Sequence, residues 1–491
     1  DTDSRGEPGG DGTGAVADAF LAAFQLVNVV RRLLSEGALN AALIPAWLRS
    51  RDRDGTAAAA AFAGRVLGTV SAALIATSIV VALLMPLIMT VIAPGFVGSG
   101  TLDRAVEYAQ LMLPYLAFAG PVTVLMGLLN AQGRFALTAF SPLLFNIALI
   151  AAIAVLLVRH ADAGFAAWIL AATVGVAGLL QLMMLLSQRS ARLATPLRVS
   201  FDREMRAFFA KAIPGMIASS GPQWLMVAGA IIASATPSAV SWLYFANRLI
   251  ELPLGIVGVA MGTVLVPELT RAVNSGDRGA VAHAESRALE LAAGLALPAT
   301  LGLVVLAEPI VRLLFEHGAF GAEDSAATAR ALMWLALGLP AHVLIKALSP
   351  AFYARGDTMT PLRATMAGFV VTVALALLLG HAFGASGIAA SIASGAWCST
   401  LFLLRKGTSE FGFSVDASAR ARLPRIVLAA IVMGALLWLT TGLVPAESHG
   451  LIQFIALCVQ IAAGIVVYGL LLQILGAASW REAVHALKRP G

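Results

Sequence analysis

Thirteen apolar runs, each long enough for about 20 residues of helix, follow one another along this chain of 491 residues. That is the length an α-helix needs to cross the hydrocarbon core of a bilayer. Hydrophobic residues make up 59% of the chain, more than a soluble protein of this length needs to fill one or two cores. The sequence therefore predicts an all-α, polytopic membrane protein with about 13 transmembrane helices. The runs lie near residues 15–48, 57–92, 105–129, 138–158, 164–186, 207–232, 238–266, 288–314, 328–353, 362–381, 385–404, 425–443 and 451–476.

The loops between these runs alternate in charge. Counted alternately, one set carries most of the loop arginines, from Arg49 after the first run to Arg489 after the last. The other set, which begins with the acidic N-terminal tail, holds only three arginines, Arg5, Arg104 and Arg159. Because cytoplasmic loops are enriched in Lys and Arg, the basic set is predicted to be cytoplasmic, with the start of the chain outside and the C-terminus inside.

Short sequence matches recur at one offset, which indicates an internal repeat. Gln25-Leu26 precedes Arg248-Leu249 by 223 residues, and Ala131-Gln132-Gly133 precedes Ala354-Arg355-Gly356 by the same number. Six runs separate the copies, so both cross in the same direction, as in a parallel repeat about the membrane normal. We expect two six-helix lobes around a shared cavity. The predicted divisions are an extracytoplasmic tail (1–14), a first lobe (15–186), a cytoplasmic linker (187–206), a second lobe (207–404), a cytoplasmic loop (405–424), a C-terminal helix pair (425–476) and a cytoplasmic tail (477–491).

The first run carries charges that a membrane span rarely tolerates. Asp18, Gln25, Arg32 and Glu36 are spaced by 7, 7 and 4 residues, which places them on one helix face, and Arg31 falls beside that face. A charged side chain at bilayer depth costs roughly 2.5 to 3.5 kcal/mol on insertion scales, so such residues indicate a polar cavity or a substrate pathway.

A second polar stretch, Ser241 to Pro253, is similar to the first. Ser241 and Arg248 share a face, Glu251 can pair with Arg248, and Pro253 predicts a kink near the arginine. A purely structural Arg248–Glu251 pair is the alternative. The matching polar stretch one repeat earlier favours function.

Arginine suits a particular ligand. Its guanidinium stays charged and offers a planar fork to two phosphate or carboxylate oxygens. Arg31, Arg32 and Arg248 in one cavity would suit a solute with a phosphate or diphosphate, while Asp18 and Glu36 would hold these arginines in the empty cavity or carry a coupling cation. His342 and Lys346, four residues apart, form a third polar spot, for which a structural role is the simpler interpretation.

Other polar or reactive residues have simpler interpretations. Arg65 and Arg312 lie near the ends of runs, from which they can extend to the lipid headgroups. The two cysteines, Cys398 and Cys458, lie in apolar runs and predict neither a disulfide framework nor a metal site. No phosphate-binding loop, HExxH, CxxC or GxSxG motif is present, and no basic region with interleaved aromatics suggests nucleic acid.

Longer segments resemble the MurJ (MviN) family of lipid II flippases, within the MOP exporter superfamily. They are ADAFLAAFQLVNVVRRLLSEGALNAALIP, LLNAQGRFALTAFSPLLFN, VSWLYFANRLIELPLGIVGVAMGTVLVPEL, VRLLFEHGAF and LSPAFYARGDTMTP, in family order across residues 14–363. Beyond about residue 365 only hydropathy supports the likeness.

The resemblance implies two six-helix lobes facing a cationic cavity, with two C-terminal helices forming a groove for a polyprenyl tail. It implies a substrate, the undecaprenyl-diphosphate-linked disaccharide-pentapeptide, that moves from the cytoplasmic to the periplasmic leaflet by alternating access. Family functional positions correspond to Asp18, Arg31, Glu36, Ser241 and Arg248.

Three features depart from the family pattern. The family has fourteen helices, and its arginine-bearing first helix has no counterpart among the thirteen runs. Asn247 stands where the family commonly has Asp, which removes a carboxylate. Gln25 and Val27 stand where the family usually has a basic residue and proline. Helical spacing favours Arg32 for the cavity, whereas the resemblance favours Arg31, which we prefer.

We therefore expect a non-enzymatic lipid II flippase of the bacterial inner membrane. It would need no cofactor, would be driven by the membrane potential or by H⁺ or Na⁺, and would contact membrane lipids and the cell-wall synthesis machinery. The alternatives are a drug or oligosaccharide-lipid exporter of the same superfamily, and an intramembrane transferase. A transferase would need catalytic groups in an external loop, and only the loop with Glu316, His317, Glu323 and Asp324 offers them.

Overall fold

The computed structural model confirms an all-α membrane protein. It describes residues 13–35, 38–187, 193–219, 221–260, 269, 272, 277–355, 357–413, 415–441 and 451–477, and within these ranges regular structure is helical, with no strand. Nine helices in the described part are long and apolar enough to cross a membrane. The chain divides into two compact units, residues 1–241 and 242–491.

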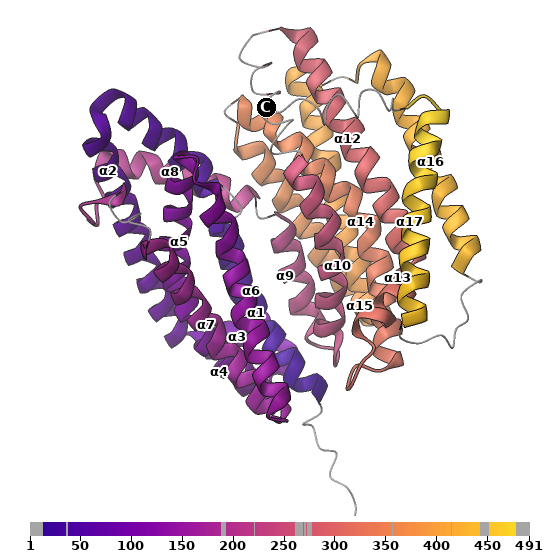
Figure 1. Cartoon of the computed structure of the whole chain (residues 1–491), viewed down its shortest axis with the longest axis horizontal. Coiled ribbons are helices and arrows are strands. Elements are labelled where there is room, and N and C mark those ends of the chain that lie inside the picture. Colours follow the sequence, from indigo (N-terminus) through magenta and orange to yellow (C-terminus); the bar gives the residue numbers. More distant parts are fainter. Residues whose placement is uncertain are drawn as a thin grey trace, which may run out of the picture. The chain divides into compact units, whose positions relative to one another are not determined.

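The first unit is built from helices that run alongside one another (Figure 1). Its elements are α1 (Thr13–Ser35), α2 (Ala38–Leu83), α3 (Met85–Ile92), η1 (Pro94–Phe96), α4 (Gly100–Met112), α5 (Pro114–Ala131), α6 (Phe135–Val158), α7 (Ala163–Ser187), α8 (Arg203–Ser219), α9 (Gly221–Ala233) and the start of α10 (Ala239–Ala260). Its core gathers α2, α5, α7 and α8, with Leu125 and Leu128 of α5 fully buried beside Phe62 of α2 and Met205 of α8.

The second unit contains the rest of α10 and the remaining helices. They are α12 (Arg278–Val305), α13 (Ala307–Phe315), α14 (Ala322–Ala354), α15 (Met359–Phe411), α16 (Ala417–Thr441) and α17 (Leu451–Ile474). Helix α14 packs against α12 and α15. A Cβ on Gly338 of α14 would lie 2.9 Å from Cα of Ala393 in α15, so the two helices approach closely because glycine stands there.

The described residues of all thirteen predicted apolar runs are mostly helical, although the boundaries differ. The first run falls on α1, described to Ser35, and on α2, described from Ala38. Two predicted runs share α15, which changes direction at Gly384, where φ is +55°. The predicted loop 405–424 is mostly helical, since α15 continues to Phe411 and α16 begins at Ala417. The number of membrane crossings stays a prediction.

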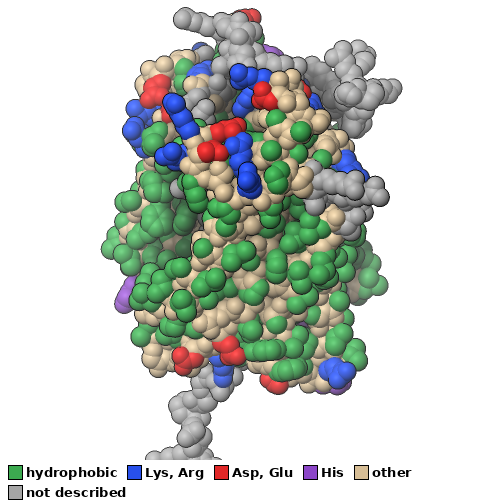
Figure 2. Space-filling model, turned by 90° about the vertical axis from the view of Figure 1, so that its left-hand side faces the viewer, with side chains coloured by type: hydrophobic (Ala, Val, Ile, Leu, Met, Phe, Trp, Pro, Cys, Tyr) green, Lys and Arg blue, Asp and Glu red, His purple; other side chains and the backbone are tan. Residues whose placement is uncertain are grey.

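The boundary between the two units also differs from the predicted linker. The division falls at Ser241, after the predicted linker 187–206, because α8 packs against α2 and α9 packs against η1. Figure 2 shows a broad belt of hydrophobic side chains on the viewed face, with most of the visible Lys and Arg side chains gathered at one end. A belt of this kind suits a lipid-facing surface.

The segment between α7 and α8 lies along α2 as a strap, defined here as residues 193–202. A Cβ on Gly64 would lie 2.2 Å from the backbone oxygen of Pro196, and one on Gly68 would lie 2.4 Å from that of Arg198. Thr69 Oγ1 accepts from the backbone N–H of Ser200 at 3.0 Å and donates to the backbone oxygen of Ser200 at 3.2 Å. The strap therefore rests on a strip of α2 that side chains at positions 64 and 68 would block.

Ion pairs anchor the end of the strap. Arg65 donates to Asp202 Oδ2 and to Glu204 Oε2, each at 2.7 Å, and its contact with the headgroups stays a prediction. Asp202 Oδ1 also accepts from the backbone N–H of Met205 at 2.8 Å and thereby caps α8. The Met205 N–H, the Ser200 hydroxyl and Arg65 together lower the pKa of Asp202 to about 2.

Candidate functional site

Asp18 and Ser241, both predicted site residues, are in direct contact in the first unit. Asp18 is buried in α1, with 3% of its surface exposed. Its carboxylate accepts from the backbone N–H of Ser238 at 2.8 Å, from that of Ser241 at 3.1 Å, and from the Ser241 hydroxyl. The first N–H groups of a helix have no partner within the helix and carry partial positive charge. Asp18 therefore serves as a remote N-cap for α10.

The contact joins equivalent positions of the predicted repeat. Asp18 and Ser241 are 223 residues apart, which is the offset of the sequence matches. The contact therefore links two positions that the repeat offset makes equivalent.

Two glycine contacts accompany this carboxylate at the α9–α10 turn. A Cβ on Gly14 would lie 3.0 Å from Ser238 Oγ, and one on Gly95 of η1 would lie 2.0 Å from the Ser234 backbone oxygen. The N–H of Gly95 donates to Ser234 Oγ at 3.0 Å. The turn, residues 234–241, is thus held at Asp18, Gly14 and Gly95. We call this set of contacts the clamp.

Arg248 lies in the second unit within a small polar cluster on α10. Its Nη1 donates to Glu251 Oε2 at 3.0 Å, which confirms the predicted pair, and its Nε donates to the Tyr244 hydroxyl at 3.2 Å. The guanidinium carbon stands 5.3 Å from the centre of the Tyr244 ring, close enough for a cation–π contact. The Arg248 side chain remains 41% exposed.

Asn247 completes this cluster. Its Nδ2 donates to Glu251 Oε1 at 2.9 Å, so the two carboxylate oxygens of Glu251 receive Asn247 and Arg248 separately. The amide therefore contributes a donor where the family commonly has a carboxylate. Pro253 lies inside α10, which continues to Ala260. The kink predicted there stays a prediction.

The remaining predicted site residues are described only in part. Gln25 is partly buried on α1. Arg31 and Arg32 lie on α1, but their side chains are outside the described part of the structure, as is the whole of Glu36. The choice between Arg31 and Arg32 therefore stays a prediction.

Two acidic residues near the external loop proposed for a transferase, Glu316 and Asp324, have partners. Trp242 Nε1 donates to Asp324 Oδ1 at 2.8 Å, and the N–H of Gly321 donates to Asp324 Oδ2 at 3.0 Å. Arg312 donates through Nε to Glu316 Oε2 at 3.2 Å, and its contact with headgroups stays a prediction. These contacts stabilise the ends of α10, α13 and α14.

Sequence reasoning missed the residues that hold the α9–α10 turn. Ser238 immediately precedes α10, and serine before an apolar run is a familiar sign of a helix start. Gly95 follows Pro94, which marks only a turn. Neither signal could show that these residues meet segments of the chain more than a hundred positions away.

Comparison with known proteins decides the family. A family model described as "Lipid II flippase MurJ" matches residues 12–459. The chain belongs to the MurJ family. A probable lipid II flippase MurJ from Rhizobium meliloti (strain 1021) is 36% identical, over 97% of this chain and 91% of that relative. The lipid II flippase MurJ of Burkholderia cenocepacia is 32% identical, over 87% of this chain and 84% of its own length.

Solved structures agree on the fold. A lipid II flippase MurJ in an inward closed conformation matches with a TM-score of 0.75 at 21% identity, over 96% of this chain and 94% of that one. An inward-facing multidrug resistance MATE transporter of the MOP superfamily matches with a TM-score of 0.66 at 15% identity, over 84% and 94%. The MurJ fold predicted from the sequence is thereby confirmed, and MurJ is a family of transporters rather than enzymes.

Proposed function

We propose that the chain transports lipid II from the cytoplasmic to the periplasmic leaflet of the bacterial inner membrane. Its membership of the MurJ family carries this proposal, together with the curated relatives named as lipid II flippases. The polar residues on apolar helices add physical support, because a charged side chain at bilayer depth carries a free-energy cost and usually has a function there.

Arg248 is the residue we assign most directly to the substrate. Glu251 and Tyr244 hold its guanidinium from one side, while 41% of the side chain stays accessible. A diphosphate offers oxygens that match the guanidinium fork, and it can compete with the single carboxylate contact. Arg31 is proposed as the substrate-binding arginine of the first polar run, as the family resemblance implies.

The clamp is proposed to close the external side of the transport pathway. While Asp18 caps α10, the turn after α9 is held against α1 and η1. Movement of α1 away from α10 would release the Asp18 carboxylate and the α10 N–H groups to water, which replaces the lost hydrogen bonds. Such an exchange can be reversible, as alternating access requires.

The driving force and the orientation complete the proposal. We propose coupling to the membrane potential or to a gradient of H⁺ or Na⁺, a cytoplasmic C-terminus, and contact with the cell-wall synthesis machinery. The loop charges support the orientation.

Growth rescue tests the assignment of Arg248. In cells depleted of their own flippase, Arg248→Ala should reduce lipid II transport at least about tenfold, since a charge-assisted bidentate contact is lost. Arg248→Lys should retain part of the activity because the charge remains without the fork. Arg330→Ala, an exposed arginine on α14 of the same unit, is the matched control and should rescue fully. Undiminished rescue by Arg248→Ala would remove Arg248 from the mechanism.

A drug exporter of the MATE type is the alternative, because MATE structures share the fold. A site for cationic drugs should favour carboxylates and aromatic rings over arginine. Purified protein offered lipid II and a cationic dye should bind lipid II, with loss of binding in Arg248→Ala. Preferential dye binding would support the exporter.

A further inference from the structure

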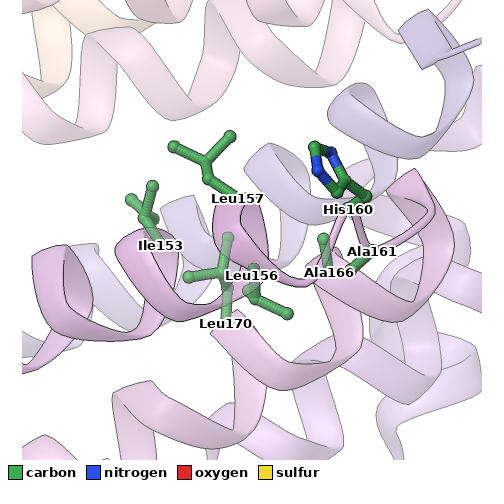
Figure 3. Close-up of a pocket in the computed structure, with 7 residues that line it drawn as sticks. All are labelled: Ile153, Leu156, Leu157, His160, Ala161, Ala166 and Leu170. Atoms are coloured by element: carbon green, nitrogen blue, oxygen red, sulfur yellow. The ribbon is translucent and has the colours of Figure 1, made fainter.

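An apolar groove lies at the turn between α6 and α7, and none of its lining residues is assigned to transport. Its volume is about 420 Å³. Leu156, Leu157 and Leu170 form apolar walls, and His160 stands at one end, as Figure 3 shows. The remaining lining residues are Ile153, Ala161 and Ala166.

The backbone of the turn fixes the shape of this groove. The N–H of His160 donates to the oxygen of Leu157, and the N–H of Ala161 donates to that of Leu156, both at 3.1 Å. This pair of bonds is a Schellman motif, whose left-handed position usually holds glycine. His160 occupies that position with φ at +48°. Asp162 then caps α7 by accepting from the N–H of Phe165 at 2.9 Å. The groove is therefore built into a hydrogen-bonded turn.

The groove opens at the end of a membrane-spanning helix. Leu157 and Val158, in the last turn of α6, are 69% and 81% exposed. They end an apolar helix, Leu137–Val158, whose outer surface is covered with exposed aliphatic side chains. Such a surface faces lipid chains, so an aliphatic chain is the natural occupant of the groove.

Arg159 directly precedes His160, which lines the groove, and supplies positive charge at this turn. It is exposed and has no ion-pair partner among the described residues, while the nearby Asp162 serves as the cap of α7. The loops predicted to be external contain only two other arginines, Arg5 and Arg104. Arg159 therefore stands against the usual charge bias, directly before His160, which lines the groove. Arginine extends from a helix end toward headgroups and binds phosphate oxygens with its fork.

We propose that this groove binds one anionic phospholipid of the external leaflet. The phosphodiester lies against Arg159 and His160, and one acyl chain fills the space between Ile153, Leu157 and Leu170. This site is separate from the proposed transport function and does not depend on it.

Native mass spectrometry of the full chain tests the site. Delipidated protein receives phosphatidylglycerol and phosphatidylcholine in equal amounts, and the bound lipids are counted. We expect preferential retention of one phosphatidylglycerol, and a loss of roughly three- to tenfold in that retention for Arg159→Gln. Ala166→Phe should give the same loss by filling the groove. Arg206→Gln, an equal charge change on α8, should retain the wild-type level.

The variants separate a built site from general attraction to basic residues. Equal loss in Arg206→Gln, equal binding of both lipids, or wild-type retention in Arg159→Gln would each overturn the proposal. Wild-type retention in Ala166→Phe would also overturn it, since the acyl chain would then lie elsewhere. Leu157→Trp fills the mouth of the groove from an exposed position and replaces Ala166→Phe if that variant does not fold. Displacement of phosphatidylglycerol by equimolar polyprenyl phosphate would assign the groove to a different occupant.

Discussion

An aspartate caps the first turn of α8 and another caps that of α10, but the first is local in sequence and the second is remote. Asp202 stands immediately before α8 and accepts from the N–H of Met205, the third residue of that helix. Asp18 lies 223 residues before Ser241, the third residue of α10, and accepts from the same position. The local cap moves with its own helix, whereas the remote cap is lost whenever α1 and α10 separate. Of the two, only the remote cap suits the gating role that we propose for the clamp.

The surroundings of the two caps also differ. Asp202 is 40% exposed and shares Arg65 with Glu204, so both ion pairs of Arg65 are screened by water. Asp18 is buried, and its carboxylate accepts hydrogen bonds from neutral donors, the N–H groups of Ser238 and Ser241 and the Ser241 hydroxyl. Burial makes the remote cap the more sensitive of the two, because an unmatched buried polar group costs more than an exposed one.

The largest effect is expected at the remote cap. Asp18→Ala leaves the N–H groups of Ser238 and Ser241 without this acceptor, at a cost of about 1–3 kcal/mol for each group that stays buried. We expect a lower melting temperature in detergent and loss of growth rescue. Asp18→Asn keeps one acceptor oxygen and should lose less. An Asp18→Ala protein with wild-type melting and rescue would contradict the importance of this cap.

A smaller effect is expected where the strap rests on α2. Gly64→Ala places a Cβ 2.2 Å from a backbone oxygen, which must move, and overpacking of this kind costs about 1–3 kcal/mol. Proteolysis within residues 193–202 should become faster. Gly294→Ala in α12 meets nothing within 4 Å and is the matched control, with unchanged cleavage. Equal cleavage of wild type and Gly64→Ala would show that the strap is not held by this contact.

The smallest effect is expected at the local cap. Asp202→Asn retains a capping oxygen but loses the charge that pairs with Arg65. Because the pKa of Asp202 is lowered from 3.8 to about 2, its stabilisation is complete above about pH 4 and is lost as the pH falls toward 2. As the pH falls from about 4 toward 2, protection from hydrogen exchange at the start of α8 should decrease in wild type and change less in Asp202→Asn. An identical pH profile in both proteins would exclude the charge of Asp202 as the cause.

Sequence reasoning identified what depends on neighbouring residues. The Arg248–Glu251 pair follows from helical spacing, and the apolar runs follow from length and hydrophobicity. Asp18 and Ser241 were chosen as site residues, and their common repeat offset is visible in the sequence, but their contact is not. For Arg65 the sequence indicates only a place near the end of an apolar run. Its ion pairs could not be predicted, because Asp202 and Glu204 lie 137 and 139 residues away. The helical part of residues 405–424 was missed because its charges resemble a loop.

Cross-linking of the clamp tests the central claim most directly. A Cβ on Gly14 would lie 3.0 Å from Ser238 Oγ, so the double variant Gly14→Cys and Ser238→Cys should form a disulfide once Cys398 and Cys458 are replaced by serine. The account predicts that oxidation stops the appearance of lipid II in the external leaflet, that reductant restores it, and that neither single variant responds. Undiminished transport by fully cross-linked protein would contradict the claim that the clamp must open.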